Sequence, residues 1–313
     1  MELNSINNIN DFYSKLQNSY TVRYYEELFR QKKIKEYSST NNRLKLFLTH
    51  LKPIVYLYQD YMIKKKKQIL GNSLYDYAKE IFSNKEEYIK LYNLLSDEES
   101  KDTLLDILKY RISFDRDYLN NNVRPASDQY LDSQILHFTD SEVIADCGAY
   151  YGENCLSYYK YMKTAKKYYL IEPIPLCIST CKKNFSRENF KNIEYCQVAT
   201  GDENTEANFN FSIGGGSSFT NDSSNTTKIC KLDDLIKEKL TYLKMDIEGS
   251  ESSTLAGCIN QIKTYKPKLA ICAYHKPGDL WKLATQILEY RNDYKIYLRL
   301  YQSGFCEAVL YFI

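Results

Sequence analysis

Two segments of the chain place an acidic residue directly after an apolar run. The first reads Val143-Ile-Ala-Asp-Cys-Gly-Ala-Tyr-Tyr-Gly152, so Asp146 ends a predicted strand and Gly148 and Gly152 follow in a turn. Glycines let such a turn bring its backbone close to a ligand. Phosphate-binding loops read G-x-G-x-x-G or G-x-x-x-x-G-K-[ST], and this segment has neither pattern. Because a carboxylate repels phosphate, the ligand implied is positive or zwitterionic, as is S-adenosylmethionine (SAM).

The second acid follows about 26 residues later, at the end of the next apolar run. The segment Tyr168-Tyr-Leu-Ile-Glu-Pro173 closes a predicted strand with Glu172. In sheets that bind nucleotides, an acid at this position accepts hydrogen bonds from ribose hydroxyls. The ordered pair of Asp146 and Glu172 therefore favours a cofactor that contains a ribose.

A further group of candidate residues combines carboxylates with a histidine. Asp246, Glu248 and Glu251 follow an apolar run, and His275 follows the next one along the chain. Acids in this position also suit a helix N-terminus, and a lone histidine is often structural. Because both groups should lie at the same edge of the sheet, His275 is also a candidate general base, and Asp246 is the second candidate.

These residues belong to a half of the chain in which short apolar runs alternate with helical patterns. We predict strands near 143–147, 167–171, 193–198, 241–246, 268–273, 294–301 and 306–312, and helices near 153–163, 175–185, 251–263 and 279–290. Strands separated by helices form right-handed βαβ units in a parallel sheet. Only Gln302-Ser-Gly-Phe305 joins the last two strands, so they should pair antiparallel as a hairpin.

The N-terminal part of the chain has a different pattern. From about residue 8 to residue 120 the apolar residues recur at helical spacing. We therefore predict a helical domain over residues 1–125 and an α/β domain over 126–313. Residues 202–230 show little helical pattern and should form an excursion over the edge of the sheet that carries the site.

The composition excludes several classes of protein. The 313 residues include 42 Lys plus Arg and 40 Asp plus Glu, a net charge of +2, so nothing indicates a nucleic-acid partner. No apolar run is long enough to span a membrane and the N-terminus does not resemble a signal peptide, so we expect a cytoplasmic protein. The nine cysteines include no C-x-x-C pair, which argues against a zinc site or a disulfide framework.

Together these motifs resemble the FkbM family of SAM-dependent methyltransferases. The resemblance runs in order from about residue 125 to the C-terminus and is most specific in Asp246-Ile-Glu-Gly-Ser-Glu251. The other matching motifs are Asp146-x-Gly-Ala-x-x-Gly152, Glu172-Pro173, Leu232-Asp-Asp-Leu235 and Lys266-Pro-x-Leu-Ala270. A bacterial branch of the family is indicated by Tyr274-His-Lys276, Ala308-Val-Leu-Tyr311 and Leu108-Lys-Tyr-Arg-Ile112. That branch often has Arg-His-Tyr in its penultimate strand, where this chain has Arg299-Leu-Tyr301.

The resemblance implies a class I methyltransferase fold, a Rossmann-like sheet of seven strands with an antiparallel C-terminal hairpin. It also implies O-methylation of a sugar or glycan precursor, with SAM as the cofactor. By the same resemblance, the loop from Gly148 to Gly152 holds the methionine part of SAM, Glu172 binds the ribose hydroxyls, and Ala199 lies near the adenine. The full set of predicted cofactor-binding residues is Asp146, Gly148, Ala149, Gly152, Asn154, Glu172, Pro173 and Ala199.

We therefore predict a SAM-dependent O-methyltransferase whose acceptor is a small molecule or a glycan, such as a nucleotide sugar. A sugar hydroxyl is weakly acidic, so a base must take its proton, with His275 as the first candidate and Asp246 as the second. A divalent metal near Asp246 stays open, because no ligand pattern indicates or excludes one. Two other functions stay open as well, an NAD-dependent oxidoreductase and a non-catalytic SAM-binding module. The missing third glycine of the loop argues against the oxidoreductase.

Overall fold

The structure describes parts of both predicted domains, the helical N-terminal domain and the α/β domain. The computed structural model describes residues 8–17, 73–113, 116–120, 122–152, 165–186, 192–210, 218–219, 226–302 and 307–313. Asn154 and the helix predicted near 153–163 lie outside these residues. Among the helices that the structure describes, none is long and apolar enough to cross a membrane.

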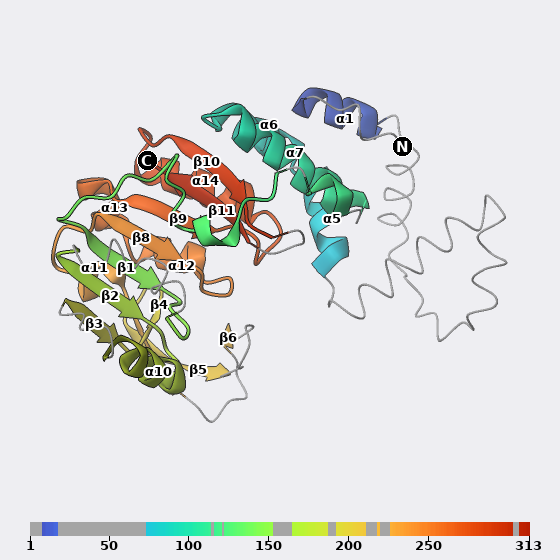
Figure 1. The fold of residues 1–313 in the computed structure, drawn as a ribbon. Coiled ribbons are helices and arrows are strands. Elements are labelled where there is room, and N and C mark those ends of the chain that lie inside the picture. The colour runs from blue at the N-terminus through green and yellow to red at the C-terminus, as the bar shows by residue number, and fades with distance from the viewer. Residues whose placement is uncertain are drawn as a thin grey trace, which may run out of the picture.

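The central element is a mixed sheet of seven strands in the order β10-β11-β9-β8-β1-β2-β3 (Figure 1). Its strands are β1 (Val143–Cys147), β2 (Lys167–Ile171), β3 (Ile193–Cys196), β8 (Tyr242–Met245), β9 (Lys268–Cys272), β10 (Ile296–Leu300) and β11 (Ala308–Phe312). Neighbouring strands from β9 to β3 are parallel, and β11 is antiparallel to both β9 and β10. The predicted strand positions and the antiparallel hairpin are therefore confirmed.

Side chains on successive residues of a strand enter two different hydrophobic cores. In β1, Val143, Ala145 and Cys147 pack with the helices that follow β8 and β9 and with the N-terminal helices, whereas Ile144 packs with the helix that follows β2 on the other face. This alternation follows from the two-residue repeat of a strand. Both faces of the sheet are covered, which explains why its strands read as continuous apolar runs.

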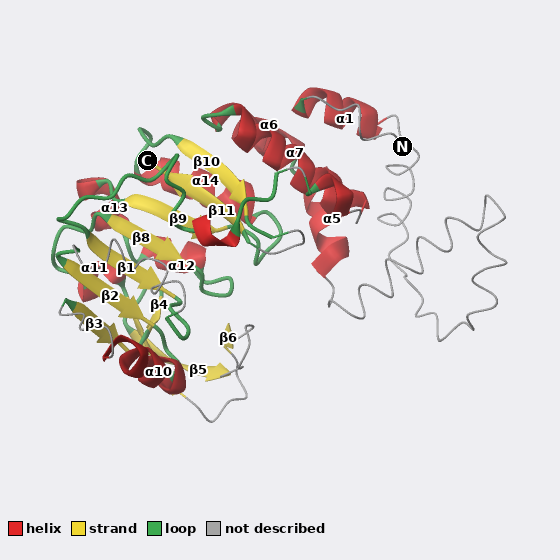
Figure 2. Cartoon of the chain, in the orientation of Figure 1, coloured by secondary structure: helices red, strands yellow, loops and turns green. Residues whose placement is uncertain are grey.

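The helices of the α/β half are α10 (Pro175–Ser186), α11 (Leu232–Leu235), α12 (Glu251–Ala256), α13 (Ile259–Tyr265) and α14 (Asp279–Tyr290), drawn in red in Figure 2. The prediction of one continuous helix over 251–263 is wrong, because the chain breaks at Gly257. A Cβ at Gly257 would lie 1.9 Å from the backbone oxygen of Gly201. The Gly257 carbonyl also accepts a hydrogen bond from the Asp233 N–H at 2.9 Å, so the break is fixed by tertiary contacts.

The predicted excursion contains strands that the sequence did not indicate. A second sheet has the order β4-β7-β5-β6, with β4 (Ala199–Thr200), β5 (Thr205–Asn210), β6 (Ser218–Phe219) and β7 (Thr226–Cys230). Its strands are short and rich in polar residues, which is why their pattern does not resemble that of the buried sheet.

The N-terminal half is helical where the structure describes it. It contains α1 (Ile9–Gln17), α5 (Ser73–Ser83), α6 (Lys85–Leu94) and α7 (Glu98–Ser113), and two short 3₁₀ turns follow at Arg116–Tyr118 and Ala126–Asp128. Helix α7 packs along β10, as Figure 1 shows, and apolar side chains of α5, α6 and α7 share one core with the sheet. The domain boundary near residue 125 stays a prediction.

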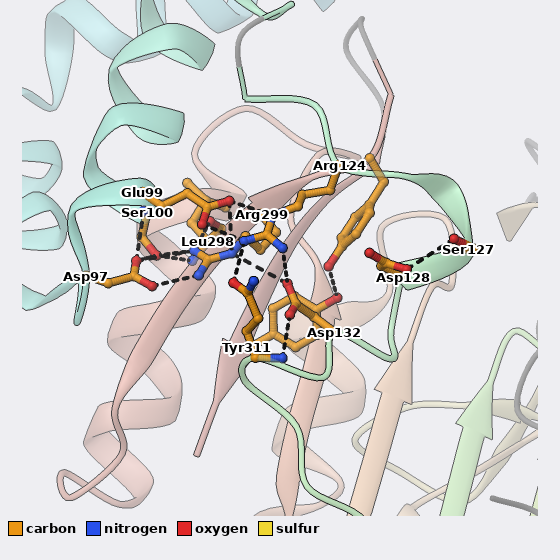
Figure 3. A network of polar contacts seen from close by, with 12 residues as sticks. Asp97, Glu99, Ser100, Arg124, Ser127, Asp128, Asp132, Leu298, Arg299 and Tyr311 are labelled. Carbon is orange, nitrogen blue, oxygen red and sulfur yellow. Dashed lines mark hydrogen bonds and ion pairs between the residues drawn. The ribbon is translucent and has the colours of Figure 1, made fainter. Parts of the chain in front are cut away.

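A buried arginine joins the start of α7 to β10 (Figure 3). The Arg299 side chain is 2% exposed, and its Nη2 lies 2.6 Å from Asp97 Oδ2. Its Nη1 donates to Ser100 Oγ at 2.8 Å. Asp97 Oδ1 also accepts the Ser100 N–H at 2.9 Å and so caps α7. These partners balance a guanidinium that would be costly to bury alone.

Arg124 extends this network toward the segment before β1. Its Nε donates to Glu99 Oε1 at 2.6 Å, and its Nη1 lies 3.7 Å from Asp132 Oδ2. Arg299 Nε lies 3.6 Å from the same Asp132 oxygen. The two arginines therefore hold the segment around Asp132 against α7 and β10 (Figure 3).

Candidate active site

The candidate site lies where neighbouring parallel strands end. In the sheet, β1 lies between β2 and β8, and β9 is the other neighbour of β8. Asp146 lies near the end of β1, Glu172 directly follows β2, Asp246 directly follows β8, and His275 follows β9. Because the carboxyl ends of parallel strands share one edge, the fold brings these predicted residues to the same side of the sheet.

Gly148 places the predicted cofactor loop directly against Asp246. Its φ is +77°, and a Cβ at this position would lie 1.8 Å from the backbone oxygen of Asp246. The Asp246 N–H donates to the Cys147 carbonyl at 3.1 Å, so the two strand ends are bonded beside the loop. Only glycine combines this φ with so close an approach.

Gly152, at the other end of the loop, is required by helix packing. Its φ is +80°, and a Cβ here would lie 2.9 Å from Phe185 Cε2 and 3.2 Å from Cys181 Sγ. Both of these residues belong to α10. A larger residue at Gly152 would therefore disturb the packing of α10, whatever its effect on a ligand.

Asp146 forms a fully buried ion pair with Lys244. Both residues are 0% exposed, and the Lys244 Nζ lies 3.0 Å from Asp146 Oδ1. The Tyr168 hydroxyl donates to the other oxygen, Oδ2, at 2.7 Å. The sequence suggested that this carboxylate attracts a cationic ligand. In the structure its cation comes from the protein, so Asp146 supports the loop from within.

Lys244 also binds the loop that follows β1. Its Nζ donates to the Gly148 carbonyl at 2.8 Å and lies 3.3 Å from the Cys147 carbonyl. Burial lowers the pKa of Lys244, but the negative charges of Asp146 and Asp246 outweigh burial and raise it above its usual value. A charged Lys244 therefore ties the loop to β8.

The Glu172 carboxylate is positioned by backbone N–H groups on both sides. Its Oε2 accepts from the Tyr150 N–H and its Oε1 from the Ile174 N–H, each at 3.0 Å. Burial raises the pKa of Glu172, and the two hydrogen bonds oppose that rise. Each oxygen of a carboxylate has a second acceptor position. Glu172 can therefore accept two hydroxyl hydrogens, as the binding of a ribose requires.

The other predicted cofactor residues belong to the loop after β1 or to segments that follow β2 and β3. Ala149 is buried in the loop, Pro173 directly follows Glu172, and Ala199 begins β4 after the end of β3. A small apolar cluster also lies in this region, made of Tyr150, Tyr151, Ile174 and Cys177.

Asp246 is held by two tyrosine hydroxyls. Tyr130 donates to Oδ2 at 3.0 Å, and Tyr274 donates to Oδ1 at 3.1 Å. The Asp246 side chain is 24% exposed, in contrast to the buried Asp146. A carboxylate that is both oriented and accessible can take a proton from a bound hydroxyl group.

His275 is surrounded by carboxylates. Its side chain is 8% exposed, with Nδ1 2.8 Å from Glu251 Oε1 and Nε2 3.4 Å from Asp246 Oδ1. Burial lowers the pKa of His275, but the close contact with Glu251 and the charges of Glu251, Asp246 and Glu248 raise it to about 9. The imidazole is therefore protonated at neutral pH and cannot accept a proton there. These contacts favour Asp246 over His275 as the candidate base.

The carboxylates beside His275 have other partners as well. Glu251 Oε1 accepts the Ile247 N–H at 3.0 Å, and Asp246 accepts from its two tyrosines. Over the residues that the structure describes, no group of three or more His, Cys, Asp or Glu side chains is arranged to hold a metal ion.

Three residues of this site were not predicted from the sequence as site residues, namely Lys244, Tyr130 and Tyr274. Lys244 could have been recognised from the sequence, because a lysine inside the apolar run Tyr242–Met245 needs a partner if that strand is buried. Tyr274 adjoins His275, but nothing in the pattern distinguishes its hydroxyl. Tyr130 has no local signal, since it is one of 31 tyrosines and lies 116 residues before Asp246.

The fold is similar to solved methyltransferase structures. A crystal structure of methyltransferase FkbM from Methylobacillus flagellatus KT has 31% sequence identity and a TM-score of 0.68, and the match covers 76% of this chain and 61% of that chain. This chain therefore spans less than two thirds of that relative. No curated protein matches the chain.

More distant structural matches are also methylases or bind SAM. One is an rRNA methylase from Streptococcus thermophilus, with 16% identity and a TM-score of 0.37 over 60% of this chain and 95% of that chain. Another is Aeropyrum pernix fibrillarin in complex with SAM, with 10% identity and a TM-score of 0.38 over 59% and 72% of the two chains. At these TM-scores neither match supports a conclusion about this protein.

A family model described as the methyltransferase FkbM domain matches residues 146–296. This range includes the predicted site residues from Asp146 to His275, the end of β1 and the whole of β2, β8 and β9. The sheet, with β11 antiparallel, is that of a class I Rossmann-like methyltransferase, as predicted. Membership of a bacterial branch stays a prediction. Residues 146–296 therefore form an FkbM methyltransferase domain.

Proposed function

We propose that this chain is a SAM-dependent O-methyltransferase that acts on a hydroxyl of a sugar or glycan precursor. The family of its domain supports SAM as the cofactor. The observation that carries the proposal is the packing of Gly148 against the backbone of Asp246. A cofactor held by this loop would lie next to a carboxylate that can take the proton of the acceptor.

The residues around the loop suit the parts of SAM. When bound, SAM supplies a methyl group on a positively charged sulfur, ready for in-line attack by an oxygen. Glu172 would accept the ribose hydroxyls, because its two oxygens keep acceptor positions beyond their backbone hydrogen bonds. Residues 148–152 would hold the methionine part, and Ala199 would lie near the adenine. Asp146 and Lys244 would act by holding the loop.

Asp246 is the proposed general base. The acceptor hydroxyl must lose its proton as the new bond between oxygen and carbon forms, and Asp246 is oriented and partly exposed. With a pKa raised to about 9, His275 would stay protonated at neutral pH. Its positive charge would then lie beside the carboxylates of Asp246 and Glu251.

The charges around Asp246 favour an uncharged sugar ring as the group that is methylated. Glu248 is exposed at this edge, and Glu307 lies near enough that the charge of Asp246 contributes to its raised pKa, after the larger effect of burial. A phosphate here would be repelled by these carboxylates. If the acceptor is a nucleotide sugar, its phosphates would therefore extend away from this edge.

Transfer of an isotope-labelled methyl group from SAM to a panel of monosaccharides, glycans and nucleotide sugars tests the proposal. The wild type should methylate one class of acceptor in a single turnover, and Asp246→Asn should slow that step by about 10²–10⁴-fold without changing SAM affinity. Asp140→Asn, which changes an exposed aspartate before β1, is the matched control.

Two outcomes would contradict the proposal. Binding of SAM without transfer to any acceptor would favour a non-catalytic SAM-binding module. Binding of a nicotinamide cofactor in place of SAM would favour an oxidoreductase.

A further inference from the structure

Tyr130 is a buried residue that is fixed through its backbone and its ring. Its N–H donates to the Tyr311 hydroxyl at 3.0 Å, and its carbonyl accepts from the Tyr242 hydroxyl at 2.6 Å. The Lys244 Nζ lies 5.1 Å from the centre of its ring. The φ of Tyr130 is +63°, a conformation that bulky residues seldom adopt. Such a conformation persists where the surroundings over-determine it, and it is concentrated at functional sites.

The hydroxyl of Tyr130 is directed at Asp246. It lies 3.0 Å from Asp246 Oδ2 and 3.1 Å from Cys272 Sγ. A tyrosine hydroxyl has one hydrogen, so donation to the carboxylate leaves its oxygen to accept from the thiol. Burial raises the pKa of Tyr130 and of Cys272 well above their usual values, and both groups therefore stay protonated. The hydrogen bonds run in one direction, from Cys272 through Tyr130 to Asp246.

A second hydroxyl completes the arrangement from another segment of the chain. Tyr274, which follows β9, donates to Asp246 Oδ1, whereas Tyr130 reaches Oδ2 from the segment before β1. Two donors on the two oxygens restrict rotation of the carboxylate. The charged groups that interact with Asp246 are Lys244, His275 and Glu307, and His275 also lies 3.8 Å from Glu248 Oε2.

We propose that Tyr130 is a positioning residue whose hydroxyl, together with that of Tyr274, fixes the direction of the Asp246 carboxylate for proton transfer from the acceptor. This proposal rests on the function proposed above. Loss of either hydroxyl would let the carboxylate turn and would remove a hydrogen bond that favours its ionised form. The SAM-binding residues would keep their contacts.

Tyr130→Phe tests this role, because phenylalanine keeps the ring over Lys244 and the two backbone hydrogen bonds. We expect kcat to fall roughly 10- to 100-fold, the effect of losing one hydrogen bond to a charged group. The KM for the acceptor and the Kd for SAM should not change. The acid limb of the kcat profile should move to higher pH by about one unit or more. Tyr274→Phe should have the same effects.

The matched control is Tyr294→Phe, which removes a buried hydroxyl that donates to the Pro267 carbonyl at 2.7 Å, outside the site. A readout independent of turnover is the carboxyl ¹³C resonance of Asp246, assigned by its loss in Asp246→Asn. Its titration midpoint should rise in Tyr130→Phe and stay constant in Tyr294→Phe. This readout separates the proposal from the proposed function, because it needs neither SAM nor an acceptor. An unchanged midpoint in a folded Tyr130→Phe protein would overturn the proposal, whatever the rate of methyl transfer.

Discussion

Gly148 and Asp246 meet through their backbones at the point where β1 and β8 end. A Cβ at Gly148 would lie 1.8 Å from the Asp246 carbonyl oxygen, closer than any real side chain allows. The predicted cofactor loop and the proposed base are therefore held at a fixed separation by the main chain.

Gly148→Ala should lower the free energy of unfolding by more than an alanine usually does at a position with positive φ. Gly278→Ala is the control, because Gly278 has a φ of +83° but its Cβ would meet only side-chain atoms, of Glu80 and Lys282, and no backbone. The control should lower the free energy of unfolding by about 1–2 kcal/mol. Gly148→Ala should cause a larger loss of unfolding free energy than this control. It should also reduce methyl transfer at least tenfold, since Asp246 must move. Equal losses of stability in urea denaturation would show that the contact with Asp246 is unimportant.

The pair formed by Lys244 and Asp146 should behave as a coupled unit. Lys244→Met removes the cation that faces a fully buried carboxylate and should destabilise the fold by about 3–5 kcal/mol. Adding Asp146→Asn to this variant should restore part of the loss, because no buried charge then faces an apolar side chain. A double-mutant cycle measured by chemical denaturation checks this coupling. Strict additivity of the two single changes would exclude it.

Most of the fold could be predicted because the strands of the main sheet are local apolar runs with clear ends. The break between α12 and α13 could not, since it depends on the contact of Gly257 with Gly201. The second sheet was also missed. Its longest strand, Thr205–Asn210, has only two apolar residues, Ala207 and Phe209, although these alternate with polar residues as in a half-buried strand.

The site could be predicted only in part. The placement of Glu172 and Asp246 at one edge of the sheet could be predicted, because acids that follow parallel strands meet there. The protonation of His275 depends on carboxylates that only the folded chain brings around it. The role of Tyr130 depends on a contact across 116 residues. Candidate reactive groups are therefore visible in the sequence, whereas the side chains that orient them and set their charge are visible only in the structure.

The raised pKa of His275 predicts how stability depends on pH. With a pKa of about 9 in the folded state and about 6.5 in the unfolded state, the charged imidazole stabilises the fold fully below pH 6.5. This stabilisation should be lost as the pH rises through about 9, and it should amount to about 3 kcal/mol at most. Unfolding free energies of wild type and His275→Gln should therefore converge between about pH 6 and pH 10.

His137→Gln is the control for this pH dependence, because His137 is exposed. Its stability profile should run parallel to that of the wild type. A parallel profile for His275→Gln would mean that His275 is not held in its charged form.

The most direct test of a SAM site at this edge is calorimetric titration of SAM into wild type, Glu172→Gln and Glu194→Gln. Glu194 lies on β3 with a side chain that is 46% exposed, so its change controls for the loss of a negative charge. The wild type and Glu194→Gln should bind one SAM per chain with equal affinity. Glu172→Gln should bind roughly 10- to 100-fold more weakly, because its amide replaces an acceptor oxygen of the carboxylate with a donor. Unchanged SAM affinity in Glu172→Gln, or no SAM binding by the wild type, would contradict the account.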